Sequence, residues 1–156
     1  MNKKLFGICL LLVVVASISA VSAFDFGDLF GMGDQNETVT IGGIDFNIPA
    51  GFKEDQSGLT NGVVDALKEA KYKVDGKTYS KGSTGVGLFV ANFSDFEIDG
   101  EEMLSDFAGD DGITINNVGG FMEVDDDVNI FCYVKDNCFV VVSSNDKNVI
   151  GDFVIA

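Results

Sequence analysis

Residues 128–144 have the sequence VNIFCYVKDNCFVVVSS and form the densest apolar stretch of the chain after its N-terminal segment. Apolar residues on both sides of Asp136-Asn137 predict two strands, at 128–135 and 138–143, joined by a two-residue turn. Because the strands carry apolar residues on both faces, we expect them to lie at the centre of a sheet. The other elements are expected to pack around this central hairpin.

The two cysteines of this hairpin are predicted to remain free thiols. A two-residue turn places Val134 opposite Phe139 and Lys135 opposite Cys138. Cys132 then points to the same side of the sheet as Val134, and Cys138 points to the other side. A disulfide needs two Cβ atoms that converge, so this register excludes one even in an oxidising compartment.

The rest of the chain alternates short strand patterns with tight-turn residues. Strands are predicted at 38–41, 44–48, 71–74, 77–80, 85–93, 113–115 and 121–124, and helices at 61–70, 99–109 and 145–156. Gly42-Gly43 and Asp75-Gly76 are expected to form two-residue hairpin turns, and Gly119-Gly120 a bend. The predicted fold class is α+β: a twisted antiparallel β-sheet of about six to eight strands with two or three short helices packed on it.

The opening sequence VTIGGIDFNIPAGF (39–52) and the closing sequence NIFCYVKDNCFVVVSS (129–144) carry a resemblance to a known fold. Over about residues 38–155 the order of elements resembles the PsbP/Mog1-type α+β sandwich. The chain is also similar to small exported archaeal proteins with the same opening and ending. Members of the sandwich group bind diverse partners, so the resemblance implies a fold and carries over no catalytic residues.

The N-terminus has the three-part pattern of a signal peptide, residues 1–23. Lys3 and Lys4 precede an uncharged apolar run at 5–20, and small residues lead up to Ala23. Cleavage is expected after Ala23, which predicts an extracellular or cell-surface location. The alternative is an uncleaved membrane anchor, since the run approaches the length of about 20 residues that a spanning helix needs.

Two further segments are predicted after the signal peptide. Residues 24–37 are rich in Gly, Asp and Phe and are expected to form a flexible leader, because the glycines disfavour a helix. A short aromatic docking segment is the alternative reading of this leader. Residues 38–156 are expected to form one α+β domain, because the remaining length suits a single domain.

Composition excludes several classes of function. The chain contains 25 acidic residues against ten basic ones, all of them Lys, and its net charge is −15. Such a surface repels nucleic acid, which is excluded as a partner. The absence of His removes the usual catalytic triads and His-ligated metals, and no phosphate-binding or dinucleotide-binding glycine motif is present. Paired carboxylates could serve a glycosidase, but the chain has no Trp for sugar stacking.

Four acidic residues, Asp95, Glu97, Asp99 and Asp106, are the candidate metal ligands. The first three form D-x-E-x-D-G with Gly100, which matches the start of a calcium-binding loop, and Asp106 lies at the position of the final ligand. The segment before them has a strand pattern, whereas an EF-hand needs a helix there. The simpler reading is a solvated loop in which Asp99 caps the helix at 99–109.

The sequence therefore favours a non-enzymatic domain with a binding or structural role at the cell envelope, with an envelope or extracellular partner. No catalytic residue and no cofactor is predicted. A calcium-dependent envelope protein built on the acidic loop is the alternative, and an enzyme comes third. Asn36 and Asn92 lie in N-glycosylation sequons, which exported proteins can use.

Overall fold

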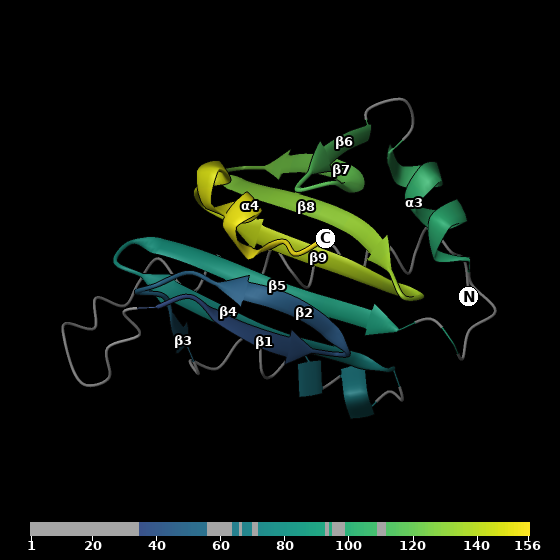
Figure 1. The fold of residues 1–156 in the computed structure, drawn as a ribbon. Coiled ribbons are helices and arrows are strands. Elements are labelled where there is room, and N and C mark those ends of the chain that lie inside the picture. The colour runs from purple at the N-terminus through teal and green to yellow at the C-terminus, as the bar shows by residue number, and fades with distance from the viewer. Residues whose placement is uncertain are drawn as a thin grey trace.

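A seven-stranded antiparallel sheet frames the domain, and a two-stranded hairpin packs on one of its faces (Figure 1). The structure is a computed structural model that describes residues 35–55, 64–65, 67–69, 72–92, 94, 99–108 and 112–156. In spatial order the strands of the sheet are β3 (Lys53–Asp55), β4 (Val74–Lys81), β5 (Thr84–Asn92), β9 (Cys138–Ser144), β8 (Val128–Lys135), β7 (Val118–Asp125) and β6 (Gly112–Ile115). The separate hairpin joins β1 (Glu37–Ile41) to β2 (Ile44–Ile48). The predicted α+β class is confirmed.

The central hairpin has the predicted register. Val134 pairs with Phe139 and Lys135 with Cys138, across a turn in which Asp136 and Asn137 have φ angles of 50° and 60°. Both φ angles are positive, as the favoured two-residue turn of a hairpin requires. Every residue of β9 is buried, and β9 lies between β5 and β8 in the middle of the sheet.

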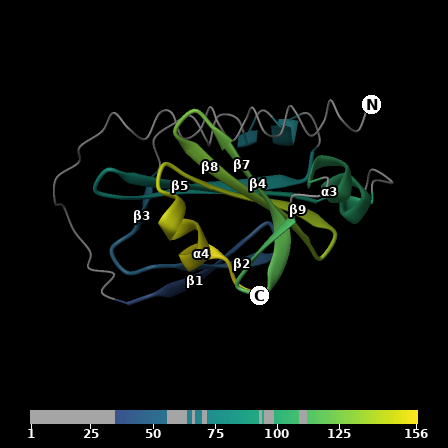
Figure 2. The same ribbon diagram turned by 90° about the horizontal axis from the view of Figure 1, so that it is seen from above.

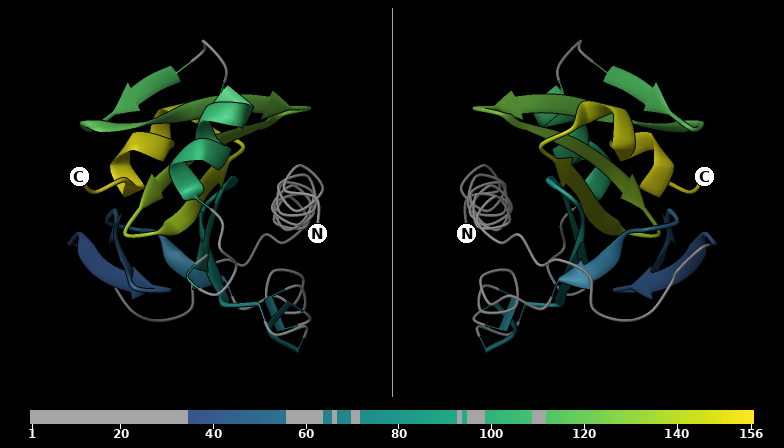
Figure 3. Two further views of the ribbon diagram at one scale, coloured as in Figure 1. Left: turned by 90° about the vertical axis from the view of Figure 1, so that its right-hand side faces the viewer. Right: turned by 90° about the vertical axis from the view of Figure 1, so that its left-hand side faces the viewer.

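The sheet has two buried faces. We call the first the hairpin face, because the β1–β2 hairpin and the C-terminal helix α4 (Ile150–Phe153) pack on it over Leu88, Phe131 and Val140. We call the second the helix face, where Val64, Leu67 and helix α3 (Gly100–Ala108) pack near Phe89, Cys132 and Val141. Figure 3 shows α4 and the β1–β2 hairpin on the same side of the sheet, and Figure 2 shows β7 and β8 crossing β4 and β5 at a steep angle.

The opening hairpin is also confirmed. Ile41 pairs with Ile44 across Gly42 and Gly43, whose φ angles are 57° and 90°. β2 ends at Ile48, directly before Pro49, which has no N–H to donate to a neighbouring strand.

The predicted turn at Asp75-Gly76 is wrong. β4 runs through both residues without a break, and the chain turns at Gly82-Ser83 instead, where Lys81 pairs with Thr84. A Cβ atom on Gly76 would lie 3.0 Å from the carbonyl oxygen of Leu88 and 3.3 Å from Val64 Cγ2. The glycine therefore serves close packing on the helix face.

The predicted bend at Gly119-Gly120 is wrong for a similar reason. The turn lies at Asn116-Asn117, where φ is 50° and 64°, and both glycines lie within β7. A Cβ on Gly120 would collide with the carbonyl oxygen of Cys132 and lie 2.9 Å from the ring of Phe131. Asparagine tolerates the left-handed conformation, so it supplies the turn and leaves the glycine to the crowded strand.

The predicted C-terminal helix is shorter than 145–156. A 3-10 turn, η2 (Lys147–Val149), leads into the four-residue helix α4, after which the chain is extended. Val154 then forms a β-bridge with Phe46 of β2, so pairing with the hairpin replaces further helix. The segment still covers the hairpin face, as expected.

Two other helix predictions are met as far as the structure describes them. Residues 64, 65 and 67–69 are helical, and α3 begins directly after Asp99. The predicted signal peptide and residues 24–34 of the predicted leader lie outside the described residues, and these assignments stay predictions. Within the described ranges, no helix is long and apolar enough to cross a membrane.

Candidate functional site

Asp99 caps the first turn of α3. Its Oδ1 accepts hydrogen bonds from the backbone N–H groups of Glu101 at 3.0 Å and Glu102 at 3.2 Å. A helix begins with N–H groups that lack partners within the helix, and an Asp at this position satisfies them. The capping role expected for Asp99 is therefore present.

The structure does not bring the described members of the candidate calcium set together. Asp106 is exposed on α3, seven residues after Asp99, which is about 10 Å along a helix axis. Asp95 and Glu97 lie outside the described residues. Among the residues that are described, no cluster of three or more His, Cys, Asp or Glu side chains could hold a metal ion. The calcium site stays a prediction that depends on Asp95 and Glu97.

Cys132 and Cys138 are free and buried on opposite faces of the sheet, as the register predicted. Burial raises the pKa of the Cys132 thiol, and the nearby charge of Glu123 raises it further. Burial also raises the pKa of Cys138, with a contribution from Asp136 and an opposing hydrogen bond to Asn92. Both thiols are therefore protonated at neutral pH, and a thiol in that form is a poor nucleophile.

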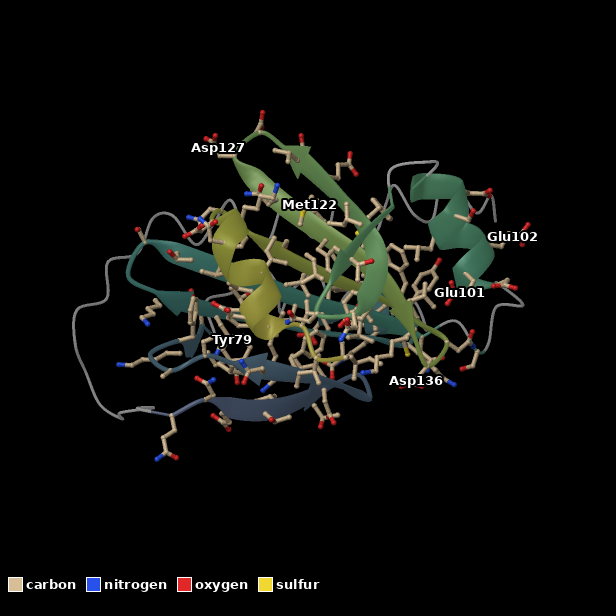
Figure 4. All side chains as sticks on the ribbon, turned by 45° about the horizontal axis from the view of Figure 1, so that its top comes forward. Tyr79, Glu101, Glu102, Met122, Asp127 and Asp136 are labelled. Atoms are coloured by element: carbon tan, nitrogen blue, oxygen red, sulfur yellow. The ribbon has the colours of Figure 1, made fainter. Side chains whose placement is uncertain are left out.

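Two tyrosines lie in the core of the hairpin face. The Oη atom of Tyr133 is buried with no hydrogen-bond partner in the described part of the chain, and burial raises the pKa of Tyr133. Burial, followed by the charges of Glu54 and Glu37, raises the pKa of Tyr79 to about 12. Tyr79 lies under α4 in Figure 4, with its ring centroid 6.4 Å from that of Phe153.

The two sequons differ in how their asparagines are held. Asn36 is exposed before β1, and its Oδ1 accepts a hydrogen bond from the N–H of Ala50 at 3.1 Å. Asn92 is half-buried at the end of β5, and its Oδ1 accepts hydrogen bonds from the N–H and the hydroxyl of Ser94. Asn36 is therefore the more accessible of the two.

Charge is distributed very unevenly along the chain. Residues 82–134 contain no Lys, Arg or His and twelve Asp or Glu. This stretch, which we call the acidic half, includes β5, α3, β6, β7 and β8. Figure 4 labels Glu101 and Glu102 on α3 and Asp127 at the β7–β8 turn. Total charge does not reveal this pattern, but the gap between Lys81 and Lys135 is visible in the sequence.

The two edges of the sheet differ in character. β3 consists of Lys53, Glu54 and Asp55, and the Nζ of Lys77 lies 2.7 Å from Glu54 Oε2. β6 has the sequence GITI and carries no charge. Charged side chains on a short edge strand discourage pairing with another strand. Only the β3 edge has that protection.

No family model, curated protein or solved structure matches this chain. The features of this chain that bear on its function are the buried thiols and phenols, the acidic half and the uncharged β6 edge.

Proposed function

We propose that the protein is an exported acidic domain of the cell envelope that binds a partner protein and has no catalytic role. The observation that carries this proposal is the burial of Cys132, Cys138 and Tyr133 within the two faces of the sheet. In many enzymes, Cys and Tyr side chains carry out covalent or acid–base chemistry, whereas in this protein these three are part of the hydrophobic core.

The ionisation of these groups supports a non-catalytic role. A catalytic thiol needs a lowered pKa and access to a substrate, and a general acid or base works best with a pKa near the operating pH. Burial moves the pKa of Cys132 and of Tyr133 upward, away from neutrality. The absence of His from the whole sequence removes the side chain that most often accepts or donates a proton in catalysis.

The envelope location rests on the signal-peptide pattern at 1–23, together with a surface charge that favours solubility. The same charge narrows the choice of partner. A strongly acidic surface attracts basic protein surfaces and repels nucleic acid and anionic lipid. A basic protein or segment at the cell surface is the partner that fits.

Two measurements test the proposal. Mass spectrometry of protein produced from the full-length chain should find Phe24 at the N-terminus, in the envelope or the medium. Retention of the protein in the cytoplasm would contradict export, and an intact Met1 in the membrane fraction would indicate an anchor. The folded protein should then capture a basic envelope protein at low salt and release it at high salt.

Thiol accessibility directly tests the burial of Cys132 and Cys138, on which the proposal rests. An alkylating reagent at neutral pH should leave Cys132 and Cys138 of the native protein unmodified and should modify both after denaturation. Rapid modification of a native thiol would count against a purely structural role for it.

A further inference from the structure

The outer edge of β6 pairs with no other strand in the described part of the chain. Asn116-Asn117 is a two-residue turn, so the flanking residues Ile115 and Val118 exchange hydrogen bonds. Hydrogen-bonded and non-hydrogen-bonded pairs alternate along an antiparallel ladder. Thr114, opposite Gly119, therefore points its N–H and C=O away from β7, and no strand of the described part of the chain pairs with that edge.

The side chains of β6 divide between the two faces of the sheet. Ile113 and Ile115 are half-buried and pack at the margin of the hairpin face. Gly112 and Thr114 are exposed and lie on the helix face, because Gly112 pairs with Phe121 of that core. A strand added beside β6 would thus meet aliphatic side chains on one face and small, uncharged positions on the other.

The helix face beside β6 is acidic. α3 packs against β7, the neighbour of β6, and carries Glu101, Glu102 and Asp106 as exposed side chains. These residues belong to the acidic half, whose sequence contains twelve Asp or Glu and no Lys, Arg or His. Long basic side chains that extend over Gly112 and Thr114 toward α3 would be attracted to this charge.

We propose that the β6 edge binds an extended segment of a partner protein as an additional strand, and that this segment alternates aliphatic and basic residues. The inference rests on the proposed binding function and names the site and the chemistry of its partner. Main-chain hydrogen bonds to Thr114 give the affinity of such an interaction, and the alternating side chains give its specificity.

A second copy of the chain fits this edge less well than a basic segment does. Pairing of β6 with β6 would place two acidic halves beside each other, and each contributes twelve acidic residues and no basic one. Like charges across an interface oppose association. Charge complementarity therefore selects a basic partner.

The test uses protein from the full-length chain and the capped peptide Lys-Val-Lys-Val-Lys-Val-Lys as the probe, with binding measured by calorimetry. Thr114→Pro removes the outward N–H without breaking a bond to β7, and Thr114→Lys adds a repelling charge while keeping the backbone intact. Each should weaken binding by about tenfold or more, and binding should weaken as salt is raised. Thr114→Val keeps both the backbone groups and the neutrality, so it should bind as wild type does.

The opposite edge of the sheet provides a matched control. Lys81 and Thr84 flank a two-residue turn, so alternation along β4 makes Glu54 the residue of β3 whose N–H points outward. Glu54→Pro should leave peptide affinity unchanged. A peptide with Glu in place of Lys should not bind.

Three results would overturn the proposal. These are Thr114→Pro and Thr114→Lys variants that bind the Lys peptide as tightly as wild type does, a Glu peptide that binds as tightly as the Lys peptide, or a wild-type dimer that Thr114→Pro dissociates. An envelope protein captured equally by wild type and Thr114→Pro would refute the β6 site and leave the binding function standing. Failure of the wild-type protein to capture any envelope protein would count against the binding function itself.

Discussion

Tyr133 combines full burial with a hydroxyl that has no partner among the described residues. A buried polar group without a hydrogen bond costs about 1–3 kcal/mol of stability. Tyr133→Phe removes the hydroxyl and keeps the ring, which stacks on Phe131 with a centroid distance of 5.5 Å. We expect this variant to be more stable by about 1 kcal/mol in urea denaturation. A loss of stability would show that the hydroxyl has a partner that the described residues do not include.

The raised pKa values of Cys132, Cys138, Tyr79 and Tyr133 predict how stability depends on pH. In each case the folded state holds its proton more tightly than the unfolded chain does. The contribution of each group to the free energy of unfolding is therefore fully present below its pKa in the unfolded chain, about 8.5 for Cys and 10 for Tyr. This contribution is lost as pH rises toward the pKa of the group in the folded state. Each group that titrates only in the unfolded state lowers the free energy of unfolding by about 1.4 kcal/mol per pH unit.

Thermal melting between pH 7 and 11 checks this dependence. The melting temperature should stay level up to about pH 8.5 and then fall. Cys132→Ala should lower stability at every pH but reduce the alkaline slope, because one titrating group is removed. A slope unchanged by the substitution would contradict the assignment to Cys132.

Within β7, two adjacent glycines have different surroundings, and this difference yields a matched pair of variants. A Cβ at Gly120 would collide with the backbone of β8, whereas a Cβ at Gly119 would meet nothing within 4 Å. Gly120→Ala should therefore destabilise the domain by about 3 kcal/mol, the upper range for overpacking, and Gly119→Ala should have little effect. Chemical denaturation of the two variants measures the contrast. An equally small loss of stability in both variants would mean that β7 and β8 can move apart to accommodate the added Cβ at little cost in free energy.

For α3, capping by Asp99 and calcium binding predict different results. Loss of an N-cap carboxylate costs about 1 kcal/mol, so Asp99→Ala should lower stability by that amount. The loss should be the same with and without millimolar calcium, and calcium should not raise the melting temperature of the wild-type protein. A calcium-dependent gain in stability that Asp99→Ala abolishes would favour the calcium-dependent alternative.

The sequence predicted a turn correctly where the turn-forming residues adopt positive φ angles, and wrongly where a glycine lies inside a strand and allows close packing. Asp136-Asn137 and Gly42-Gly43 each follow and precede uninterrupted strand patterns, and the structure has both turns there. Asp75-Gly76 and Gly119-Gly120 have the same local composition but lie inside strands. A glycine needed for left-handed backbone and a glycine needed for close approach of another segment have the same sequence signature, and only the tertiary packing distinguishes them.

The candidate binding edge could not be predicted in the same way. The register of the central hairpin followed from its turn, so the separation of Cys132 and Cys138 was predictable. The free edge of β6 depends on the spatial order of the strands, in which sequence neighbours such as β5 and β6 lie far apart and β9 sits between β5 and β8. Local pattern carries no information on that order.

At the scale of the whole molecule, the C-terminal segment ties together parts that are distant in sequence. Asn47 of the opening hairpin donates from Nδ2 to the carbonyl of Asp152 at 2.6 Å. Asn116, at the β6–β7 turn, donates to the carbonyls of Gly151 and Val154. Lys135 of β8 donates to the carbonyl of Ile155 at 3.2 Å. The β1–β2 hairpin, the β6–β7 turn and β8 are therefore all hydrogen-bonded to the same C-terminal segment.

The side chains of this C-terminal segment fill part of the core of the hairpin face. Phe153 is fully buried and meets the ring of Phe52 edge-on at a centroid distance of 5.0 Å. Phe153→Ala should cost about 3–5 kcal/mol, a large part of the roughly 5–15 kcal/mol that stabilises a domain. Val124→Ala is the control, because Val124 is 62% exposed and its truncation should change stability by less than about 0.5 kcal/mol.

Removal of residues 149–156 should then unfold the domain, because it deletes Ile150, Phe153 and Val154 together with the three side-chain attachments. Deletion of 24–34 should leave the melting temperature nearly unchanged if these residues form the flexible leader that their glycines predict. Far-ultraviolet circular dichroism and thermal melting of the two truncated proteins measure both effects. If the C-terminal truncation stayed folded and the N-terminal one did not, the domain boundary near Glu37 would be wrong. The Phe-rich segment would then belong to the core.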